Sequence, residues 1–106
     1  MNAIHLIQKD SKLTPTPVDG STGLYKSGFW KVSPQKAESL LGGKIYFHEK
    51  RATPSFFGGT IVDFYIQESD PWKDRIVFRF QPDRTCKGVK SGSDGWSMEK
   101  KYVSDK

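Results

Sequence analysis

The sequence predicts a mainly β (α+β) fold, a small curled antiparallel β-barrel with one short helix near residues 34–41. Three observations support this class. Several short runs alternate apolar and polar residues with the period of a strand, and most of their connections are short. A single stretch has the spacing of an amphipathic helix. The 106 residues suffice for one domain, and 3 Trp, 4 Tyr and 7 Phe supply much of the burial in a chain that is 35% hydrophobic.

The beginning of the chain carries little periodicity. Residues 3–7 fit either a short strand or an unanchored tail. The segment Thr14–Pro17 contains two prolines and cannot continue a helix or a central strand. We therefore expect residues 1–27 to be an N-terminal arm or loop, in part mobile, and residues 28–106 to be a single β-barrel-like domain.

A strand and then the helix are expected next. Gly28–Val32 has the composition of a short strand. Ser33 suits a helix N-cap, and Pro34 suits the first helical position. Three apolar residues at i, i+3 and i+4 then share one face, and Gly42 supplies the stop after about two turns.

The rest of the chain is expected to be strands and loops. The run Gly59–Gln67 is mostly apolar on both faces, which favours a central strand. Other expected strands are Lys44–His48, Arg75–Phe80, Arg84–Val89 and Trp96–Val103.

Charge and cysteine content bear on the class of partner and on the cellular location. Seventeen Lys and Arg against twelve Asp and Glu give a net charge of +5, which suits a polyanionic partner but also occurs in proteins that have none. Cys86 is the single cysteine, so no intramolecular disulfide can form and a reducing, cytoplasmic location is expected. Two histidines do not favour a Cys/His zinc site, and no cofactor or metal is expected. We expect no signal peptide, and no apolar run approaches the ~20 residues of a membrane span.

Three stretches resemble PUA-like domains, including their EVE and ASCH branches. Phe29–Pro34 is similar to the aromatic-Trp…Pro opening of EVE domains, and Gly42–His48 to a helix leading through a glycine turn into an apolar strand. Phe57–Tyr65 is similar to the following strand, which begins near a glycine. The resemblance covers residues 28–80, without the usual Asp after the glycine, the longer EVE segment or the charged ASCH signature. It implies a curved β pseudo-barrel with a cleft between sheet and helix that binds RNA or a flipped, often modified base.

Aromatic and polar residues supply the candidate ligand site. A base held in a cleft needs aromatic faces for stacking and a few polar groups for its edge. Phe29 and Trp30 are adjacent, so only one of them can point into the core of a strand. We expect Phe29 to be core and Trp30 to face the ligand. The expected ligand-binding residues are Trp30, Lys31, His48, Ser55, Phe56 and Trp96.

Basic residues would position the phosphates. Lys50 and Arg51 lie in the loop after Lys44–His48, and Arg84 and Lys87 begin the basic final part of the chain. We expect these four to contact phosphate. The alternative is a set of solvated charges that serve solubility.

Catalytic patterns are weak. Asp63, Glu68 and Lys73 match no metal-nuclease spacing, and Cys86 with His48 matches no established nucleophile pair. The sequence therefore predicts a non-enzymatic module that binds DNA, RNA or a nucleotide-like ligand. The alternative function is a protein–protein interaction module or accessory subunit, in which the exposed aromatics are interface anchors.

Overall fold

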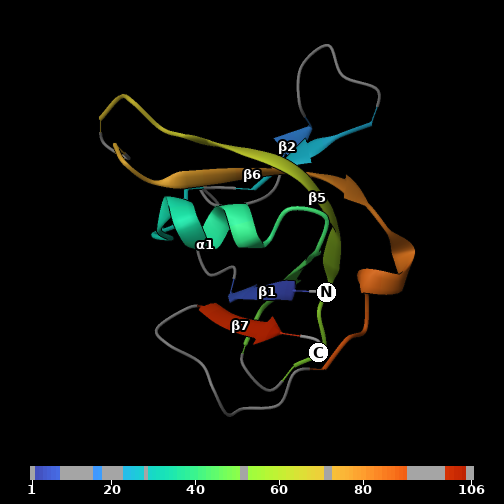
Figure 1. Ribbon diagram of the computed structural model, residues 1–106. Helices are drawn as coiled ribbons and strands as arrows, with labels where there is room; N and C mark the ends of the chain where they lie inside the picture. Colours follow the sequence, from blue (N-terminus) through green and yellow to red (C-terminus); the bar gives the residue numbers. More distant parts are fainter. Residues whose placement is uncertain are drawn as a thin grey trace.

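The computed structural model describes residues 2–7, 16–17, 23–27, 29–50, 53–70, 73–90 and 100–104. Within these ranges seven strands form one sheet in the order β2-β3-β6-β5-β4-β1-β7, with one α-helix and one 3₁₀ helix (Figure 1). The elements are β1 (Asn2–Ile7), β2 (Thr16–Pro17), β3 (Tyr25–Lys26), α1 (Pro34–Ser39), β4 (Lys44–His48), β5 (Phe57–Ile66), β6 (Ile76–Pro82), η2 (Arg84–Cys86) and β7 (Lys100–Ser104).

The mainly β class with one short α-helix is confirmed, but the expected antiparallel barrel is not. Strands β2 and β7 are the two ends of the sheet, so the described part of the chain does not close into a barrel. The sheet is also mixed, because β1 runs parallel to β4 while the other pairs are antiparallel. A parallel pair needs a long crossover. Here the crossover is the chain between Ile7 and Lys44, which contains β2, β3 and α1.

Strand β1 corrects the expected arm over residues 1–27. It lies between β4 and β7, and its Ile4 and Leu6 are fully buried. Ile4 pairs with Ile45 on one side and with Tyr102 on the other. Farther along the same range, β2 and β3 form the opposite end of the sheet, where the proline of β2 occupies the kind of edge position that tolerates it. Residues 2–7, 16–17 and 25–26 thus belong to the sheet.

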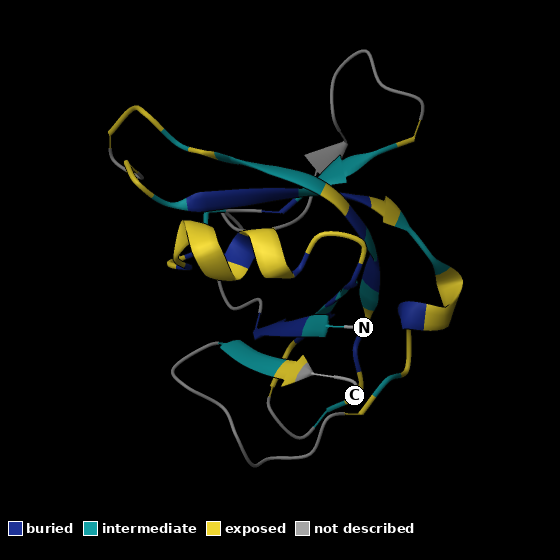
Figure 2. Ribbon diagram, in the orientation of Figure 1, coloured by how far each residue is buried: buried dark blue, intermediate teal, exposed yellow. Residues whose placement is uncertain are grey.

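Helix α1 forms where the sequence predicts it. The Ser33 Oγ accepts a hydrogen bond from the Lys36 N–H at 3.2 Å and caps the helix, and a proline occupies the first turn. Gly42 has φ +79°, a conformation that ends the helix without a Cβ penalty. Figure 2 shows α1 exposed except for one buried band at Ala37. That residue and Leu40 join the core from the helix side.

The hairpin of β5 and β6 is the longest pairing in the sheet. A β-bulge interrupts its register between Ile61 and Asp63. At this point the Ile61 N–H donates to the Gly43 carbonyl, and the Ile61 carbonyl accepts from the Gly42 N–H. The bulge therefore lets β5 hold the turn that follows α1.

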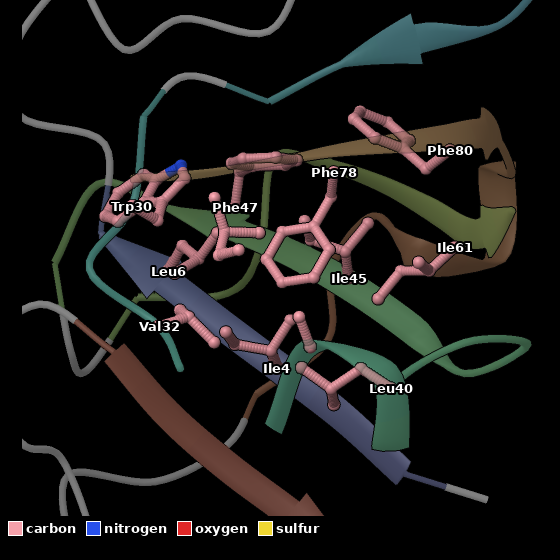
Figure 3. Packing of buried hydrophobic residues seen from close by; sticks show 12 residues of the cluster. Ile4, Leu6, Trp30, Val32, Leu40, Ile45, Phe47, Ile61, Phe78 and Phe80 are labelled. Atoms are coloured by element: carbon pink, nitrogen blue, oxygen red, sulfur yellow. The ribbon is translucent and has the colours of Figure 1, made fainter. Parts of the chain in front are cut away.

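The core lies between the sheet and α1, and aromatic residues supply much of it. Phe47, Phe78 and Phe80 are fully buried and pack with aliphatic residues of β1, β4, β5 and α1 (Figure 3). Each such ring buries on the order of 150–250 Å². The aromatic excess of the sequence is therefore used mainly for packing.

Two expected strands have other structures. Residues 84–89 begin with η2 rather than a strand, because the Asp83 side chain accepts the Thr85 N–H and caps a 3₁₀ turn. In the stretch 29–32, pairing is limited to an isolated bridge between Trp30 and Ile76. Neither helix of the described residues has the length and apolar content to cross a bilayer.

Candidate functional site

Ser55 joins two loops that are about thirty residues apart in sequence. Its hydroxyl donates to the Cys86 carbonyl at 2.5 Å and accepts from the Val89 N–H at 3.0 Å. Its main chain bonds to the Val89 carbonyl at 2.8 Å and to the Gly88 N–H at 2.7 Å. Four hydrogen bonds thus tie the loop after β4 to the segment after η2. We call this arrangement, residues 53–56 with residues 86–89, the Ser55 junction.

The junction is built from a buried polar residue. Ser55 is 4% exposed, although the sequence suggested that it would address a ligand. A buried hydroxyl needs partners, and both of its hydrogen-bonding roles are used inside the protein. Ser55 therefore positions other residues of the site and is not itself presented to a ligand.

Cations gather on the two loops that the junction joins. Lys50 lies before it in one loop, and Arg84, Lys87 and Lys90 lie in or after η2. All four are exposed, and within the described residues none of them belongs to an ion pair. We call these four residues the basic rim. Glu49 is the one carboxylate in the described stretches 49–50, 53–56 and 84–90.

The nearest further carboxylate, Asp83, is already engaged. It accepts hydrogen bonds from the Thr85 N–H and hydroxyl, and it pairs with Lys44 at 3.2 Å. The Thr85 hydrogen bonds, followed by Lys44, lower the pKa of Asp83. Lys44 also donates to Thr60 at 2.7 Å. The Asp83 charge is thus balanced locally, and the basic rim keeps its positive excess.

Phe56 provides an exposed aromatic ring beside the junction. It directly follows Ser55, its N–H donates to the Phe47 carbonyl at 2.8 Å, and it is 39% exposed. Its backbone is therefore fixed while its ring is open to solvent. Of the aromatics expected to face a ligand, Trp30 and Phe56 lie in the described residues, and Phe56 is the one that is exposed.

Trp30 is buried, which corrects its assignment to the ligand site. It is 4% exposed and packs in the core beside Leu6 and Val32 (Figure 3). Only one of the adjacent Phe29 and Trp30 can point inward, and the bridge to Ile76 turns Trp30 inward while Phe29 is half-buried. Its Nε1 has no hydrogen-bond partner in the part of the chain that the structure describes.

His48 is also internal, contrary to its expected contact with a ligand. It is fully buried, and its Nδ1 lies 2.8 Å from the Thr53 carbonyl, while its Nε2 lies 2.8 Å from the Nδ1 of His5. A carbonyl only accepts, so the Nδ1 of His48 carries the proton and His5 donates to the Nε2 of His48. Thr53 belongs to the Ser55 junction, so this hydrogen bond lets His48 support the loop that carries Lys50 and Phe56.

Burial weakens the basicity of both histidines. Desolvation, then the charges of His48 and Lys101, lower the pKa of His5 to about 4. Desolvation and Lys101 also lower the pKa of His48, although the Thr53 carbonyl opposes the shift. Tyr46 stacks on the His5 ring with centroids 4.5 Å apart. At neutral pH the pair is therefore uncharged and holds β1 to the end of β4.

The remaining candidates divide in three ways. Arg84 and Lys87 belong to the segment that the junction ties to the loop of Lys50 and Phe56. Lys31 is exposed but follows the Trp30–Ile76 bridge, away from the residues of the junction. Arg51 and Trp96 lie outside the described residues.

Sequence reasoning did not find the internal partners of the site. Asp83 did carry a signal, because an Asp side chain often accepts a hydrogen bond from the backbone N–H two residues later in a turn. The contacts of Ser55 with Cys86 and of His48 with His5 span 31 and 43 residues and leave no local pattern.

Three observations concern the groups that catalysis could use. No cluster of three or more His, Cys, Asp or Glu side chains suited to a metal occurs among the described residues. Burial raises the pKa of the Cys86 thiol, which disfavours the reactive thiolate. Asp63 receives two hydrogen bonds from the Arg79 guanidinium.

Comparison with known proteins adds no relative. No protein family, curated protein or solved structure matches the chain.

Proposed function

We propose that the chain is a non-enzymatic nucleic-acid-binding module that uses the basic rim and Phe56 as its contact surface. The observation that carries this proposal is the Ser55 junction, which joins the loop of Lys50 and Phe56 to the segment of Arg84 and Lys87. Cations would position phosphates, and an exposed ring would stack on an unpaired base. This surface replaces a cleft lined by Trp30, which is buried.

Electrostatics supports the same proposal. The basic rim has four exposed cations against Glu49, and the whole chain carries a net charge of +5. Neutralising phosphates releases counterions, so affinity should fall as salt rises. The local chain order of α1, the glycine turn, β4 and β5 supports a PUA-like relationship as part of this proposal, and the buried single thiol agrees with a cytoplasmic site of action.

Titration of fluorescently labelled single-stranded DNA, single-stranded RNA and duplex DNA with the full chain tests this function. Anisotropy should rise to saturation and weaken with added salt. The double substitution Lys50→Gln and Lys87→Gln should weaken binding about tenfold or more, because it removes two cations that would contact phosphate. The slope of log affinity against log salt concentration should become shallower by roughly 0.7 for each phosphate contact that is lost. Lys26→Gln, on β3, is the matched control. Flat titrations for all three ligands would refute the function.

A protein-interaction module is the second candidate, and one observation favours it. Leu41 and Val62 are 44% and 49% exposed. They flank the backbone hydrogen bonds between Gly42 and Ile61, so two apolar side chains are presented from adjacent segments. A partner protein that the wild type captures should be lost by the variant with Leu41→Asp and Val62→Asp. That result, together with no oligonucleotide binding by the wild type, would favour this candidate.

A further inference from the structure

Gly88 has a left-handed backbone conformation within the Ser55 junction. Its φ is +76°, and its N–H donates to the Ser55 carbonyl at 2.7 Å. The Ser55 N–H donates in turn to the carbonyl of the next residue, Val89, at 2.8 Å. Two residues, the first a glycine with positive φ, thus oppose a single residue, which is the hydrogen-bond pattern of a G1 β-bulge. The conformation of Gly88 therefore sets how the two loops of the junction pair.

The same hydrogen bond fixes which side chains lie across the junction from one another. The Gly88 N–H is part of the peptide group that follows Lys87, and the Ser55 carbonyl is part of the peptide group that precedes Phe56. One hydrogen bond of 2.7 Å therefore joins the peptide groups that adjoin Lys87 and Phe56. Both of these residues are exposed. A cation and an aromatic ring are thus presented to solvent from directly bonded segments.

Backbone conformation, and not a lack of space, explains the glycine. A Cβ added at Gly88 would meet no atom within 4 Å. Alanine adopts a positive φ only with strain, whereas asparagine and aspartate adopt it more readily. Gly88→Ala would therefore favour a negative φ and turn this N–H away from the Ser55 carbonyl. Lys87 would then lose its position across from Phe56 without any steric clash.

We propose that Gly88 is a positioning residue of the candidate site, which holds Lys87 across from Phe56 so that both contact one unpaired nucleotide, the ammonium its phosphate and the ring its base. This inference rests on the proposed function and names the unit that the site binds, a nucleotide of a single strand. The base and the phosphate of a nucleotide are joined through one sugar, so they can reach a cation and a ring on neighbouring peptide groups. A paired base is enclosed in the stack of a duplex and offers no free face to the ring.

Substitution of Gly88 tests the positioning role. The full chain and its variants are titrated by anisotropy with a labelled single strand of about 12 nucleotides at several salt concentrations. Gly88→Ala should weaken binding about threefold or more. Its slope of log affinity against log salt concentration should be shallower by about 0.7, since one phosphate contact is lost. Gly88→Asn should recover most of the lost affinity, because asparagine tolerates the positive φ.

Gly42→Ala is the matched control. Gly42 has φ +79°, and a Cβ added there would also meet no atom within 4 Å. It follows α1 and donates to the Ile61 carbonyl, outside the junction. The control should lower the urea midpoint about as much as Gly88→Ala does. Its salt slope should equal that of the wild type, which separates the placement of Lys87 from a general loss of stability.

A second pair of variants does not depend on the folding of Gly88→Ala. Gly88→Asp and Gly88→Asn have side chains of nearly equal shape, and both tolerate the left-handed conformation. A carboxylate beside Lys87 should repel the phosphate, so the aspartate variant should bind more weakly, with a slope shallower by about 0.7. Gly42→Asp and Gly42→Asn add the same charge difference outside the junction and should have equal slopes.

Each result has a definite meaning. A folded Gly88→Ala protein with the wild-type slope, while Lys50→Gln and Lys87→Gln still weaken binding, would overturn the positioning role and leave the proposed function intact. Equal binding by Gly88→Asp and Gly88→Asn would overturn the placement of a phosphate at Lys87. Equal or tighter binding of a duplex would overturn the unpaired nucleotide. Absence of all binding by the wild type would overturn both proposals.

Discussion

The imidazole rings of His5 and His48 share one hydrogen bond of 2.8 Å and link the parallel strands β1 and β4. The second bond of His48, to the Thr53 carbonyl, extends the link into the loop that leads to Ser55. If the Nε2 of His48 gained a proton, two N–H donors would face each other at the shared bond. The protonation state of the two histidines is therefore coupled to the position of the loop that carries the candidate site.

The pair predicts that the protein loses stability in mild acid. Both folded-state pKa values are lowered, to about 4 for His5, so the unfolded chain binds protons that the folded protein does not. The stabilisation is complete above pH 6.5 and is lost as the pH falls toward about 4. The loss from His5 reaches up to about 3 kcal/mol. Urea unfolding across this window measures it.

His5→Asn is the control for the acid effect. An Asn amide can still donate a hydrogen bond but does not titrate. The variant should be less stable at neutral pH and should show a shallower change between pH 6.5 and about 4. A wild-type free energy of unfolding that stays level through this window would contradict the prediction.

Ser55→Ala should weaken both the fold and the site. It removes two hydrogen bonds of a buried hydroxyl and leaves the Val89 N–H and the Cys86 carbonyl short of a partner. The expected cost is about 1–3 kcal/mol in urea unfolding, together with weaker oligonucleotide binding. Ser39→Ala removes an exposed hydroxyl that donates to the Lys36 carbonyl, and its cost should stay within about 0.5 kcal/mol. Equal losses for the two variants would argue against a special role of the junction.

Substitutions of Trp30 should separate packing from binding. Trp30→Ala should destabilise the protein by about 3–5 kcal/mol because it empties a buried site. Trp30→Phe should cost less, because the lost Nε1 has no partner in the described part of the chain. Its oligonucleotide affinity should equal that of the wild type in the anisotropy titration. Lost affinity in a folded Trp30→Phe protein would restore the cleft that the structure argues against.

Phe56→Ala should lower affinity without changing the salt slope. The ring is 39% exposed, and one stacked base contributes about 1–3 kcal/mol that does not depend on counterion release. Leu41→Ala removes an apolar side chain of similar exposure, 44%, outside the site and should leave binding unchanged. Matching effects of Phe56→Ala and Leu41→Ala would mean that Phe56 does not touch the ligand.

The sequence predicted α1, β4, β5 and β6, because these elements depend on capping residues and apolar patterns within a few positions. The cap at Ser33, the proline after it and the stop at Gly42 define α1. Alternation and apolar content also predicted β4, β5 and β6. These features depend on neighbours within a few residues, which a single sequence displays.

Elements that depend on distant partners could not be predicted. Six residues of β1 contain too little pattern to show that they fit between residues 44–48 and 100–104. The inward turn of Trp30 depends on Ile76, and the burial of His48 depends on His5. The cations of the candidate site could be proposed from the sequence because their charge is visible in it. The residue that assembles them, Ser55, was placed on the ligand side because its partners are 31 and 34 residues away.

Strand β1 also sets the order in which the protein can fold. Asn2 pairs with Ser104, so the sheet receives its last strand only when the final described residues are available. A nascent chain therefore exposes the β1 edge, with its main-chain donors and acceptors, until residues 100–104 have left the ribosome. Contacts this far apart in sequence also slow the search, and folding on the millisecond-to-second scale of non-local β topologies is expected. Strand β1 thus precedes the other described strands along the chain, yet its pairing is completed by the last of them.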